Sequence, residues 1–498
     1  MTFDVHQLDT FVLVGAGVTL LAILAVRLST RAGLPSLLIY LLMGVVLGES
    51  VIGIHFENAE LAHALGFGAL ALILAEGGLT TSWFEVRPSV RLGVSLATLG
   101  VGVSVGIVAV GAHLLLGLSW QLSVLLGAVT SPTDAAAVFS VLRGLPLSRR
   151  LVGSLEVESG LNDAPTVVLV TLISTGAVAD RGVAATVLVI VFELVAGALV
   201  GLGVGFSGAW LMRRAALPSS GLYPLAVLSL SLLAYGAATG LRASGFAAIY
   251  VAALVLGNSQ LPHRAATRSF AEGVAWLAQI GLFVMLGLLL SPGRVTAGVV
   301  GIAVVGSLLL TLVARPLTVL VSSVVQPMPL REVAFVSWAG LRGAVPIVLA
   351  TIPLAEGVTD AARLFDIVFV IVVISTLLTG PTLPMVAKRL RVTRRSEPRQ
   401  LEFEVAPLER VAADLLQVTV SPVSLLHGVE VGELRLPAGS SVSMVVREGL
   451  AIVPERRTVL RHGDDLLIVT PRGQRERTVQ RLRTVSAHGR LGRWLDDG

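Results

Sequence analysis

Two apolar segments of this chain are interrupted by polar residues, in the stretches Ser131-Pro132-Thr133-Asp134 and Glu156-Val157-Glu158-Ser159-Gly160-Leu161-Asn162-Asp163. Both segments are long enough to cross a bilayer as helices. An ionisable side chain at membrane depth costs about 3 kcal/mol or more, so it usually faces a water-filled cavity, pairs with an opposite charge or lies on an ion path. The two stretches therefore predict an α-helical polytopic membrane protein with a polar site among its helices.

The composition also indicates a membrane protein. Apolar residues make up 54% of the chain and charged residues only 14%, whereas a soluble protein of this length needs a more charged surface. The absence of Cys excludes disulfides, thiolate metal sites and thiol redox chemistry. Residues 1–7 lack the basic region of a secretory signal, so we expect the first apolar segment to remain as a transmembrane helix.

A bilayer core needs about 20 apolar residues per helix, and this length predicts thirteen spans. They lie near 8–27, 36–53, 61–83, 92–116, 120–142, 150–178, 183–212, 221–241, 245–258, 270–291, 295–323, 332–355 and 364–388.

The distribution of arginine predicts the orientation of these spans. With the N-terminus outside, twelve arginines fall in inner loops and four in outer loops. The inner ones are Arg27, Arg31, Arg87, Arg91, Arg143, Arg149, Arg150, Arg213, Arg214, Arg264, Arg268 and Arg331, and the outer ones are Arg181, Arg242, Arg294 and Arg363. Cytoplasmic loops carry the excess of Lys and Arg, so we expect a cytoplasmic C-terminus and a place in the cell (inner or plasma) membrane.

The spans can be divided into two inverted six-helix repeats, spans 1–6 and 8–13, with span 7 as a linker helix. Span 5 is broken by Ser131-Pro132-Thr133, and span 12 at the same place in its set by Gly340-Leu341-Arg342-Gly343-Ala344-Val345-Pro346. Paired broken helices of this kind indicate a transporter substrate site. The alternative is that Pro132 and Pro346 only kink two helices.

The composition changes after the last span. Residues 1–392 form the transmembrane domain, 393–402 a polar linker, 403–485 a small cytoplasmic α/β domain and 486–498 a tail. Within the small domain, Ser441–Val446 and Leu450–Val453 alternate in polarity around a short turn and predict a β-hairpin, and Asp465–Val469 predicts a further strand.

Helical spacing sorts the polar residues of span 6 into two faces. Glu156, Ser159 and Asp163 share one face, while Glu158 and Asn162 share another. The two carboxylates Asp163 and Glu158 therefore look in different directions.

Arg315 lies deep in span 11, where an unpaired guanidinium would be very costly, and Glu158 is its natural partner. Asp163 then remains able to hold a proton or a hard monovalent cation, which prefers oxygen ligands. The candidate cation ligands are Asp163, Ser159, Thr133, Asn162 and Glu76. No transition metal is expected.

Three further charges lie within the spans. Asp134 and Arg342 are placed to neutralise the ends of the half-helices in the broken spans, and we favour a structural role without contact to the ion for both. Glu76 in span 3 either lines the ion path or lies near its cytoplasmic end, and the sequence leaves both readings open.

Thr133-Asp134, Glu156 to Asp163, Ala314-Arg315 and Gly340 to Gly343 together resemble the cation:proton antiporter superfamily, specifically the NhaP-like sodium or potassium/proton antiporters. The resemblance covers residues 8–390. It implies an inverted-repeat core that moves against a dimerising scaffold, with Asp163 as the exchange carboxylate and Glu158 bound to Arg315. Ala135 departs from the family, which commonly has Pro directly after the span 5 Asp.

The C-terminal segment is similar to the regulatory RCK_C (TrkA-C) domain, in residues 432–437 and 462–467. This domain often accompanies potassium/proton members, which favours K⁺ over Na⁺ as the cation and implies a homodimer. By the same resemblance, a cyclic dinucleotide or similar anion is a candidate effector, and the alternative is a domain that only stabilises the dimer. The arginines available for phosphates are Arg435, Arg447, Arg456, Arg457 and Arg461.

These features predict a secondary active transporter, not an enzyme, that exchanges a monovalent cation for H⁺ by alternating access. A single exchange carboxylate, with Asn at 162, predicts one-for-one electroneutral exchange. The alternative is an RCK-regulated cation channel, but no Thr-Val-Gly-Tyr-Gly-like filter is present. Apart from the candidate anionic effector of the C-terminal domain, no cofactor is expected. No nucleic-acid partner is expected either, because the arginines are distributed as membrane topology requires. No Gly-x-Gly-x-x-Gly follows a strand in the C-terminal segment, so Rossmann-type dinucleotide binding is not expected.

Overall fold

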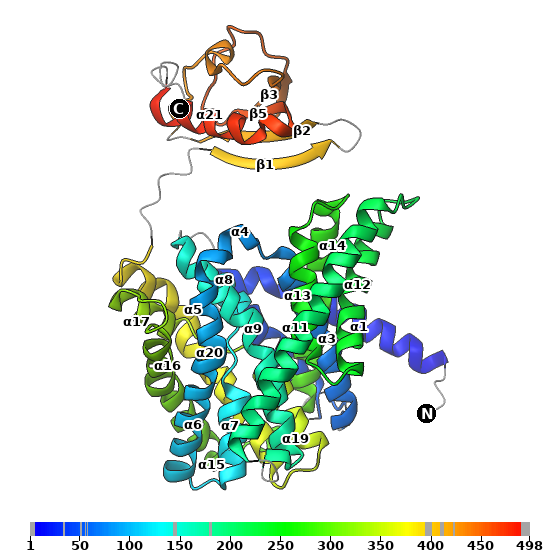
Figure 1. The fold of residues 1–498 in the computed structure, drawn as a ribbon, viewed down its shortest axis with the longest axis vertical. Helices are drawn as coiled ribbons and strands as arrows, with labels where there is room; N and C mark the ends of the chain where they lie inside the picture. Colours follow the sequence, from blue (N-terminus) through cyan, green and yellow to red (C-terminus); the bar gives the residue numbers. More distant parts are fainter. Residues whose placement is uncertain are drawn as a thin grey trace. The chain divides into compact units, whose positions relative to one another are not determined.

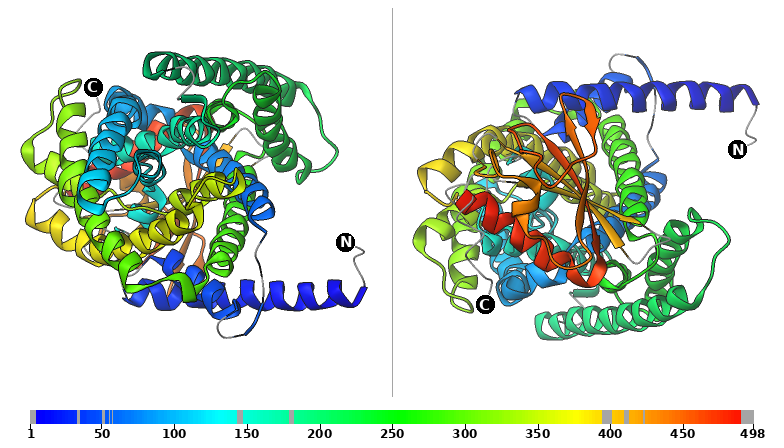
Figure 2. Two further views of the ribbon diagram at one scale, coloured as in Figure 1. Left: turned by 90° about the horizontal axis from the view of Figure 1, so that it is seen from below. Right: turned by 90° about the horizontal axis from the view of Figure 1, so that it is seen from above.

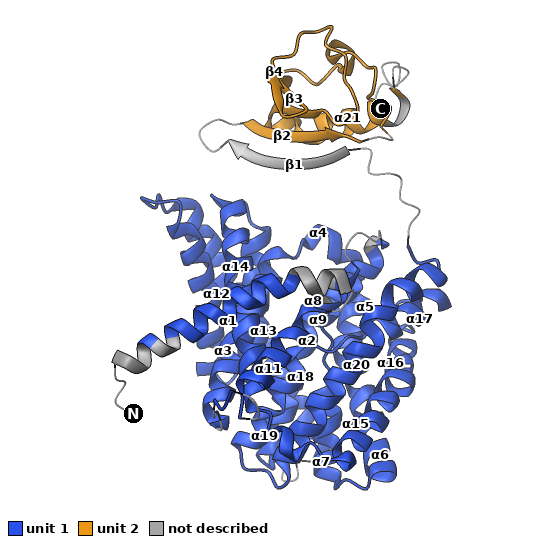
Figure 3. Ribbon diagram, turned by 180° about the vertical axis from the view of Figure 1, so that it is seen from behind, with its two compact units in different colours: residues 1–393 blue, residues 394–498 orange. Residues whose placement is uncertain are grey.

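The computed structural model describes residues 5–32, 35–49, 52–54, 56, 58–142, 147–178, 182–393, 401–408, 413–421 and 424–489. The chain divides into two compact units, Met1–Thr393 and Arg394–Gly498 (Figure 3). The first unit is helical and is called the membrane unit below. The second contains a β-sheet and is called the C-terminal unit.

The membrane unit is built from helices that, apart from the short helix α4 (Trp83–Val86), fall within or largely overlap the predicted spans (Figure 1). They are α1 (Val5–Ala32), α2 (Ser36–Leu47), α3 (Ala59–Thr80), α4 (Trp83–Val86), α5 (Val90–Ser95), α6 (Val101–Leu116), α7 (Trp120–Thr130), α8 (Ala135–Val141), α9 (Arg149–Ser174), α11 (Val183–Arg214), α12 (Leu222–Gly240), α13 (Gly245–Asn258), α14 (Arg264–Leu289), α15 (Ala297–Leu309), α16 (Arg315–Ser322), α17 (Leu330–Trp338), α18 (Ala344–Leu349), α19 (Thr351–Ala355) and α20 (Ala361–Arg389). Each predicted span contains one or more of them. Seven described helical segments have the length and apolar composition to cross a membrane, and five apolar helices are shorter, so the total of thirteen crossings stays a prediction.

Side chains at the helix starts explain several of these boundaries. Asn58, Ser119, Ser148 and Ser244 each accept a hydrogen bond from a backbone N–H in the first turn of the helix that follows. Such caps satisfy N–H groups that have no partner within the helix. A helix end is explained in the same way. Gly117, which follows the last residue of α6, adopts a left-handed conformation with φ of 65°, which suits glycine and ends the helix.

Both predicted helix breaks are present. Residues 131–134 separate α7 from α8, and residues 339–343 separate α17 from α18. The two non-helical segments lie beside each other, because the Asp134 backbone N–H donates to the Leu341 carbonyl at 2.9 Å. The interpretation in which Pro132 and Pro346 only kink continuous helices is therefore wrong.

A second pair of matching irregularities supports the internal repeat. The π-helical turn η2 (Leu96–Gly100) lies between α5 and α6, and η4 (Leu310–Ala314) lies between α15 and α16. These are the helices directly before the two broken spans. Single π-turns inside helices often occur at functional sites, and η4 ends immediately before Arg315.

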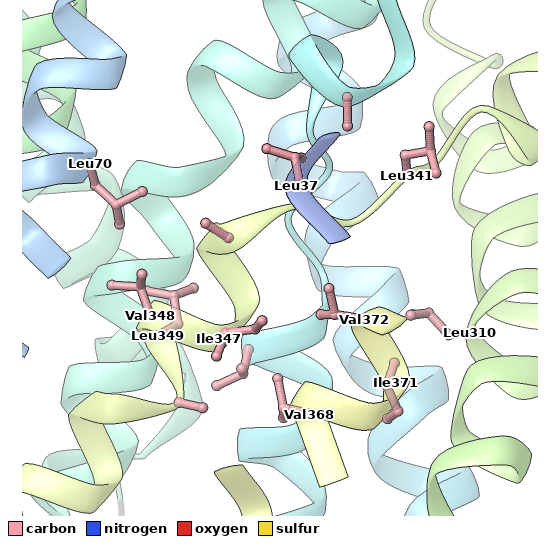
Figure 4. Close-up of a cluster of buried hydrophobic side chains, with 14 of the residues drawn as sticks. Leu37, Leu70, Leu310, Leu341, Ile347, Val348, Leu349, Val368, Ile371 and Val372 are labelled. Atoms are coloured by element: carbon pink, nitrogen blue, oxygen red, sulfur yellow. The ribbon is translucent and has the colours of Figure 1, made fainter. Parts of the chain in front are cut away.

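The helices of the membrane unit pack as two bundles. One, called the scaffold bundle, consists of α1, α2, α3, α11, α12, α13 and α14, and the other, called the core bundle, of α4–α9 and α15–α20. In Figure 2, α11 and α12 lie on one side of the unit and α16 and α17 on the other. Buried side chains from both bundles meet, among them Leu37 and Leu70 of the scaffold with Ile347 and Val348 of the core (Figure 4).

The C-terminal unit contains a five-stranded antiparallel sheet in the order β1-β2-β5-β3-β4. The elements are β1 (Leu401–Leu408), β2 (Ala413–Val420), β3 (Ser441–Arg447), β4 (Leu450–Ile452), β5 (Asp465–Pro471) and helix α21 (Arg475–His488). Alternate residues of β2 and β5 are buried, as expected for a sheet with one face on a core.

The predicted hairpin and the predicted strand at 465 are confirmed as β3–β4 and β5. Two boundaries differ from the prediction. β1 begins at Leu401, inside the predicted linker 393–402, and α21 continues to His488, inside the predicted tail 486–498.

Candidate functional site

A cavity of about 560 Å³ lies where the two bundles meet. The core bundle contributes Thr133, Asp134, Glu156, Ser159, Gly160 and Asp163 to its wall, and the scaffold bundle contributes Ser36, Glu76, Tyr250, Glu272 and Gln279. A cavity between two separately packed bundles is the arrangement expected for alternating access, because relative motion of the bundles can change the side to which it opens.

Asp163 lies near the middle of α9 and is 6% exposed. Among the described residues, its Oδ1 has no hydrogen-bond partner. A buried carboxylate without a partner is costly unless a ligand neutralises it. Asp163 is therefore suited to hold a proton or a cation.

The helical faces predicted for α9 are confirmed. Glu156 and Ser159 line the cavity together with Asp163. Glu158 and Asn162 point elsewhere, into contacts with Arg315 and Thr133.

The predicted pair of Glu158 and Arg315 is confirmed. Arg315 Nη1 donates to Glu158 Oε1, and Nη2 donates to Oε2 at 2.9 Å. The side chains are 2% and 4% exposed, so both charges are removed from solvent and neutralise each other. A Cβ at position 340 would lie 2.7 Å from Arg315 Nε, and the glycine there leaves room for the guanidinium.

Thr133 and Asn162 belong to the network around this pair. The Thr133 hydroxyl donates to Glu158 Oε1 at 3.1 Å and accepts from Asn162 Nδ2 at 3.0 Å. Thr133 still lines the cavity, but Asn162 is not among the lining residues. The amide nitrogen of Asn162 is turned toward the broken helix, while its Oδ1 has no hydrogen-bond partner among the described residues, so a role as a cation ligand stays a prediction.

Asp134 and Arg342 lie at the ends of the half-helices, as predicted. Asp134 Oδ1 accepts from the Ala137 backbone N–H at 3.1 Å and caps α8. Arg342 Nη1 donates to the carbonyls of Ser131 and Pro132 at the end of α7. Asp134 also borders the cavity and Arg342 does not, so the structural interpretation holds fully only for Arg342.

Glu76 lines the cavity near the end of α3, so the two readings left open by the sequence do not exclude each other. It joins Asp134, Glu156, Asp163 and Glu272, and no Lys or Arg occurs among the described lining residues. Carboxylates around a low-dielectric cavity raise the local concentration of cations.

The scaffold residues Tyr250, Glu272 and Gln279 were not predicted from the sequence as part of the site. A signal for two of them exists, because Glu272 and Gln279 are seven residues apart in α14 and share a helical face. Tyr250 gives no such signal, since a single tyrosine in an apolar helix is usually a packing residue.

One of the arginines predicted to bind phosphates in the C-terminal unit is engaged elsewhere. Arg447 Nε and Nη2 donate to the two carboxylate oxygens of Asp464, both at 2.8 Å. Burial alone would raise the pKa of Asp464, but hydrogen bonds from Arg447 and from the Arg461 backbone N–H lower that pKa below its usual range. Arg435, Arg456, Arg457 and Arg461 remain exposed.

Residues 17–389 match the family described as sodium/hydrogen exchanger, transmembrane, and residues 415–483 match the TrkA-C domain. The K(+)/H(+) antiporter NhaP of Alkalimonas amylolytica is 34% identical over 462 residues, which cover 90% of this chain and 79% of that protein. The K(+)/H(+) antiporter NhaP2 of Shewanella oneidensis is 34% identical over 475 residues, 94% of this chain and 82% of that protein.

A more distant relative and a solved structure were also found. The Na(+)/H(+) antiporter NhaS2 of Synechocystis is 28% identical over 385 residues, 73% of this chain and 68% of that protein. The sodium proton antiporter MjNhaP1 of Methanocaldococcus jannaschii superimposes with a TM-score of 0.65 at 20% identity, over 77% of this chain and 99% of that one. At this identity the structural likeness shows the fold alone.

Proposed function

This chain belongs to the sodium/hydrogen exchanger family of membrane antiporters, and we propose that it exchanges K⁺ for H⁺ at Asp163. One observation carries the assignment of the site. Asp163 is buried, lines the cavity between the two bundles and presents a carboxylate oxygen without a hydrogen-bond partner among the described residues. The alternative of an RCK-regulated channel finds no support, because the matching relatives are antiporters.

K⁺ is favoured over Na⁺ by the relatives. The two at 34% identity, which align over 90% or more of this chain, are named K(+)/H(+) antiporters, whereas the one named for Na⁺ is 28% identical over a shorter stretch. Selectivity depends on the size of the cavity and the number of oxygen ligands.

Competition at one carboxylate couples the two ions. A bare charge at Asp163 would be costly in the closed site, so the site is occupied by either H⁺ or a cation when the bundles move. The charge of Glu158 is already balanced by Arg315 and takes no part. One proton then exchanges for one monovalent cation.

The site is inferred to face the cytoplasm in this structure. The cavity reaches Thr80 and Thr81 at the end of α3 and Glu272 near the start of α14. The arginine distribution assigns these helix ends to the cytoplasmic side, with the N-terminus outside. Protons and cations of the cytoplasm then reach Asp163 through the cavity, whose wall carries several carboxylates.

The C-terminal unit is proposed to regulate exchange from the cytoplasm in a homodimer. Its match to the TrkA-C domain supports this role. The exposed arginines Arg435, Arg456, Arg457 and Arg461 offer donors for an anionic effector such as a cyclic dinucleotide.

Exchange by the purified protein in proteoliposomes tests the choice of cation. Vesicles that carry an imposed pH gradient receive equal concentrations of K⁺, Na⁺, Rb⁺ or Li⁺, and an internal pH-sensitive dye reports proton movement. We expect the lowest apparent KM for K⁺. Proton movement driven by Na⁺ or Li⁺ at concentrations where K⁺ is without effect would contradict the proposal.

A further inference from the structure

Tyr250 of the scaffold bundle lies against the turn of α9 that carries the exchange residues. Gly160 follows Ser159 directly and is three residues before Asp163, and both Gly160 and Tyr250 line the cavity. A Cβ at position 160 would lie 2.5 Å from the Tyr250 hydroxyl oxygen, closer than real contacts allow. Only glycine at 160 therefore lets the hydroxyl end of the phenol reach the backbone of α9 beside Asp163.

The position of this ring is fixed by its own bundle. Tyr250 is 5% exposed, and its backbone lies against α3, because a Cβ at Gly78 would be 2.7 Å from the Tyr250 carbonyl oxygen. The Thr81 hydroxyl donates to the Gly77 carbonyl at 2.6 Å. Asn258 at the end of α13 donates to the Thr81 carbonyl at 2.9 Å, which ties α13 to α3. The ring is thus a wall held on two joined helices, and it does not belong to the helix that carries Asp163.

We propose that Tyr250 determines cation specificity, because its phenol is the wall that limits the room for a cation at Asp163. The inference rests on the proposed exchange at Asp163. Discrimination among hard monovalent cations depends on the size of the site and the rigidity of its walls. The rigid phenol ring of Tyr250, packed against Gly160, sets the size of the cation site at Asp163. A smaller side chain at position 250 enlarges that site.

Two substitutions test whether the Tyr250 phenol limits the size of the cation site. Tyr250→Phe removes only the hydroxyl, and Tyr250→Leu removes the ring. Each enlarges the site, so the apparent KM for Rb⁺ relative to K⁺ should fall, by about tenfold for Tyr250→Phe and by more than that for Tyr250→Leu, since one group of methylene size in a pocket changes specificity about tenfold. The apparent KM for Na⁺ relative to K⁺ should rise. Exchange is measured in proteoliposomes with NaCl, KCl and RbCl.

Tyr235 provides a matched control. It also rests on a glycine, since a Cβ at Gly245 would lie 2.7 Å from Tyr235 Cδ2, but this contact joins α12 to α13 within the scaffold bundle. Tyr235 packs against Phe246 and is not among the residues described as lining the cavity. Tyr235→Phe and Tyr235→Leu should leave the Rb⁺/K⁺ and Na⁺/K⁺ ratios at their wild-type values.

Ratios within about twofold of wild type in both Tyr250 variants, or equal shifts in the Tyr235 variants, would overturn the proposal. If Tyr250→Leu is not folded, Tyr250→Phe decides alone. If a folded variant transports too slowly, the rise of its melting temperature with each salt gives the same affinity ratios without transport. Asp163→Asn is measured in parallel: wild-type exchange in that variant would reject the exchange site itself, whatever the Tyr250 ratios are.

Discussion

Removal of either charge from the pair of Glu158 and Arg315 is expected to destabilise the membrane unit strongly. The side chains are 2% and 4% exposed, and two hydrogen bonds join them. Glu158→Gln leaves a buried guanidinium without a counter-charge, and Arg315→Ala leaves a buried carboxylate in the same situation. Such a charge typically costs about 3–5 kcal/mol.

The structure also predicts which of the two variants, Glu158→Gln or Arg315→Ala, loses more stability. Gln at 158 keeps an oxygen that can accept from Thr133 and Arg315, so its loss should lie near the lower end of that range. Ala at 315 also removes the long side chain and its contact with the Val336 carbonyl, so its loss should lie near the upper end. In the double variant Glu158→Gln with Arg315→Met no unpaired charge remains, and part of the stability should return.

Thermal unfolding in detergent measures these effects as a double-mutant cycle. The pair of Arg294 and Asp366 is the control, because it has the same two-bond geometry but Arg294 is 47% exposed. Asp366→Asn, which leaves only the solvent-accessible Arg294 without a counter-charge, should cost only about 1 kcal/mol or less. The reasoning would be refuted if the single variants of Glu158 and Arg315 had the melting temperature of the wild type. It would also be refuted if the stability loss of the double variant equalled the sum of the two single losses.

Three further outcomes are expected. One-for-one exchange predicts that a cation gradient drives no net transport current on a solid-supported membrane, and currents that scale with voltage would rule it out. Truncation after Arg395 should change the pH or cation dependence of exchange while exchange itself remains, whereas an unchanged profile in a dimeric, inserted protein would reject a regulatory C-terminal unit. The folded-state pKa of Asp464 is lowered, so this group contributes stability above its unfolded pKa of about 3.9, and the contribution is lost as pH falls through the folded value. The protection factors of the amides in β2 and β5 of the full chain, which correct exchange for its intrinsic pH dependence, should therefore stay constant above pH ~4 and fall below it. A fall already between pH ~7 and ~5 would speak against the Arg447 pair as its cause.

The pair of Glu158 and Arg315 could be predicted from the sequence because the alternatives were few. Helical spacing separates Glu158 from the face of Asp163, and a deeply placed arginine requires a carboxylate. Both steps need only the geometry of one helix and the cost of a buried charge. The same reasoning located the two helix breaks, where Pro and Gly residues interrupt apolar segments.

The side chains inside a break could not be predicted in this way. Residues 131–134 have no regular periodicity, so their directions depend on the partner segment that crosses them. Asn162 shares the face of Glu158, but its hydrogen bond to Thr133 appears only once the break is positioned.

Part of the scaffold half of the site was also beyond the sequence. Tyr250 lies in a helix that shows nothing but an apolar pattern, and its place in the site follows from the approach of one bundle to the other. In the C-terminal unit, the pairing of Arg447 with Asp464 depends on the neighbouring positions of β3 and β5, which are separated by a long connection. Contacts between distant elements are therefore what one sequence leaves undetermined.

The most direct test of the account is cation-driven proton exchange by Asp163→Asn in proteoliposomes. The amide keeps the shape of the side chain but cannot alternate between a proton and a cation, so exchange should fall to the level of empty vesicles while the protein stays folded and inserted. Asp366→Asn, the same change at a buried carboxylate that is paired with Arg294 outside the cavity, should retain exchange. Proton movement at near wild-type rate in Asp163→Asn would contradict the central claim.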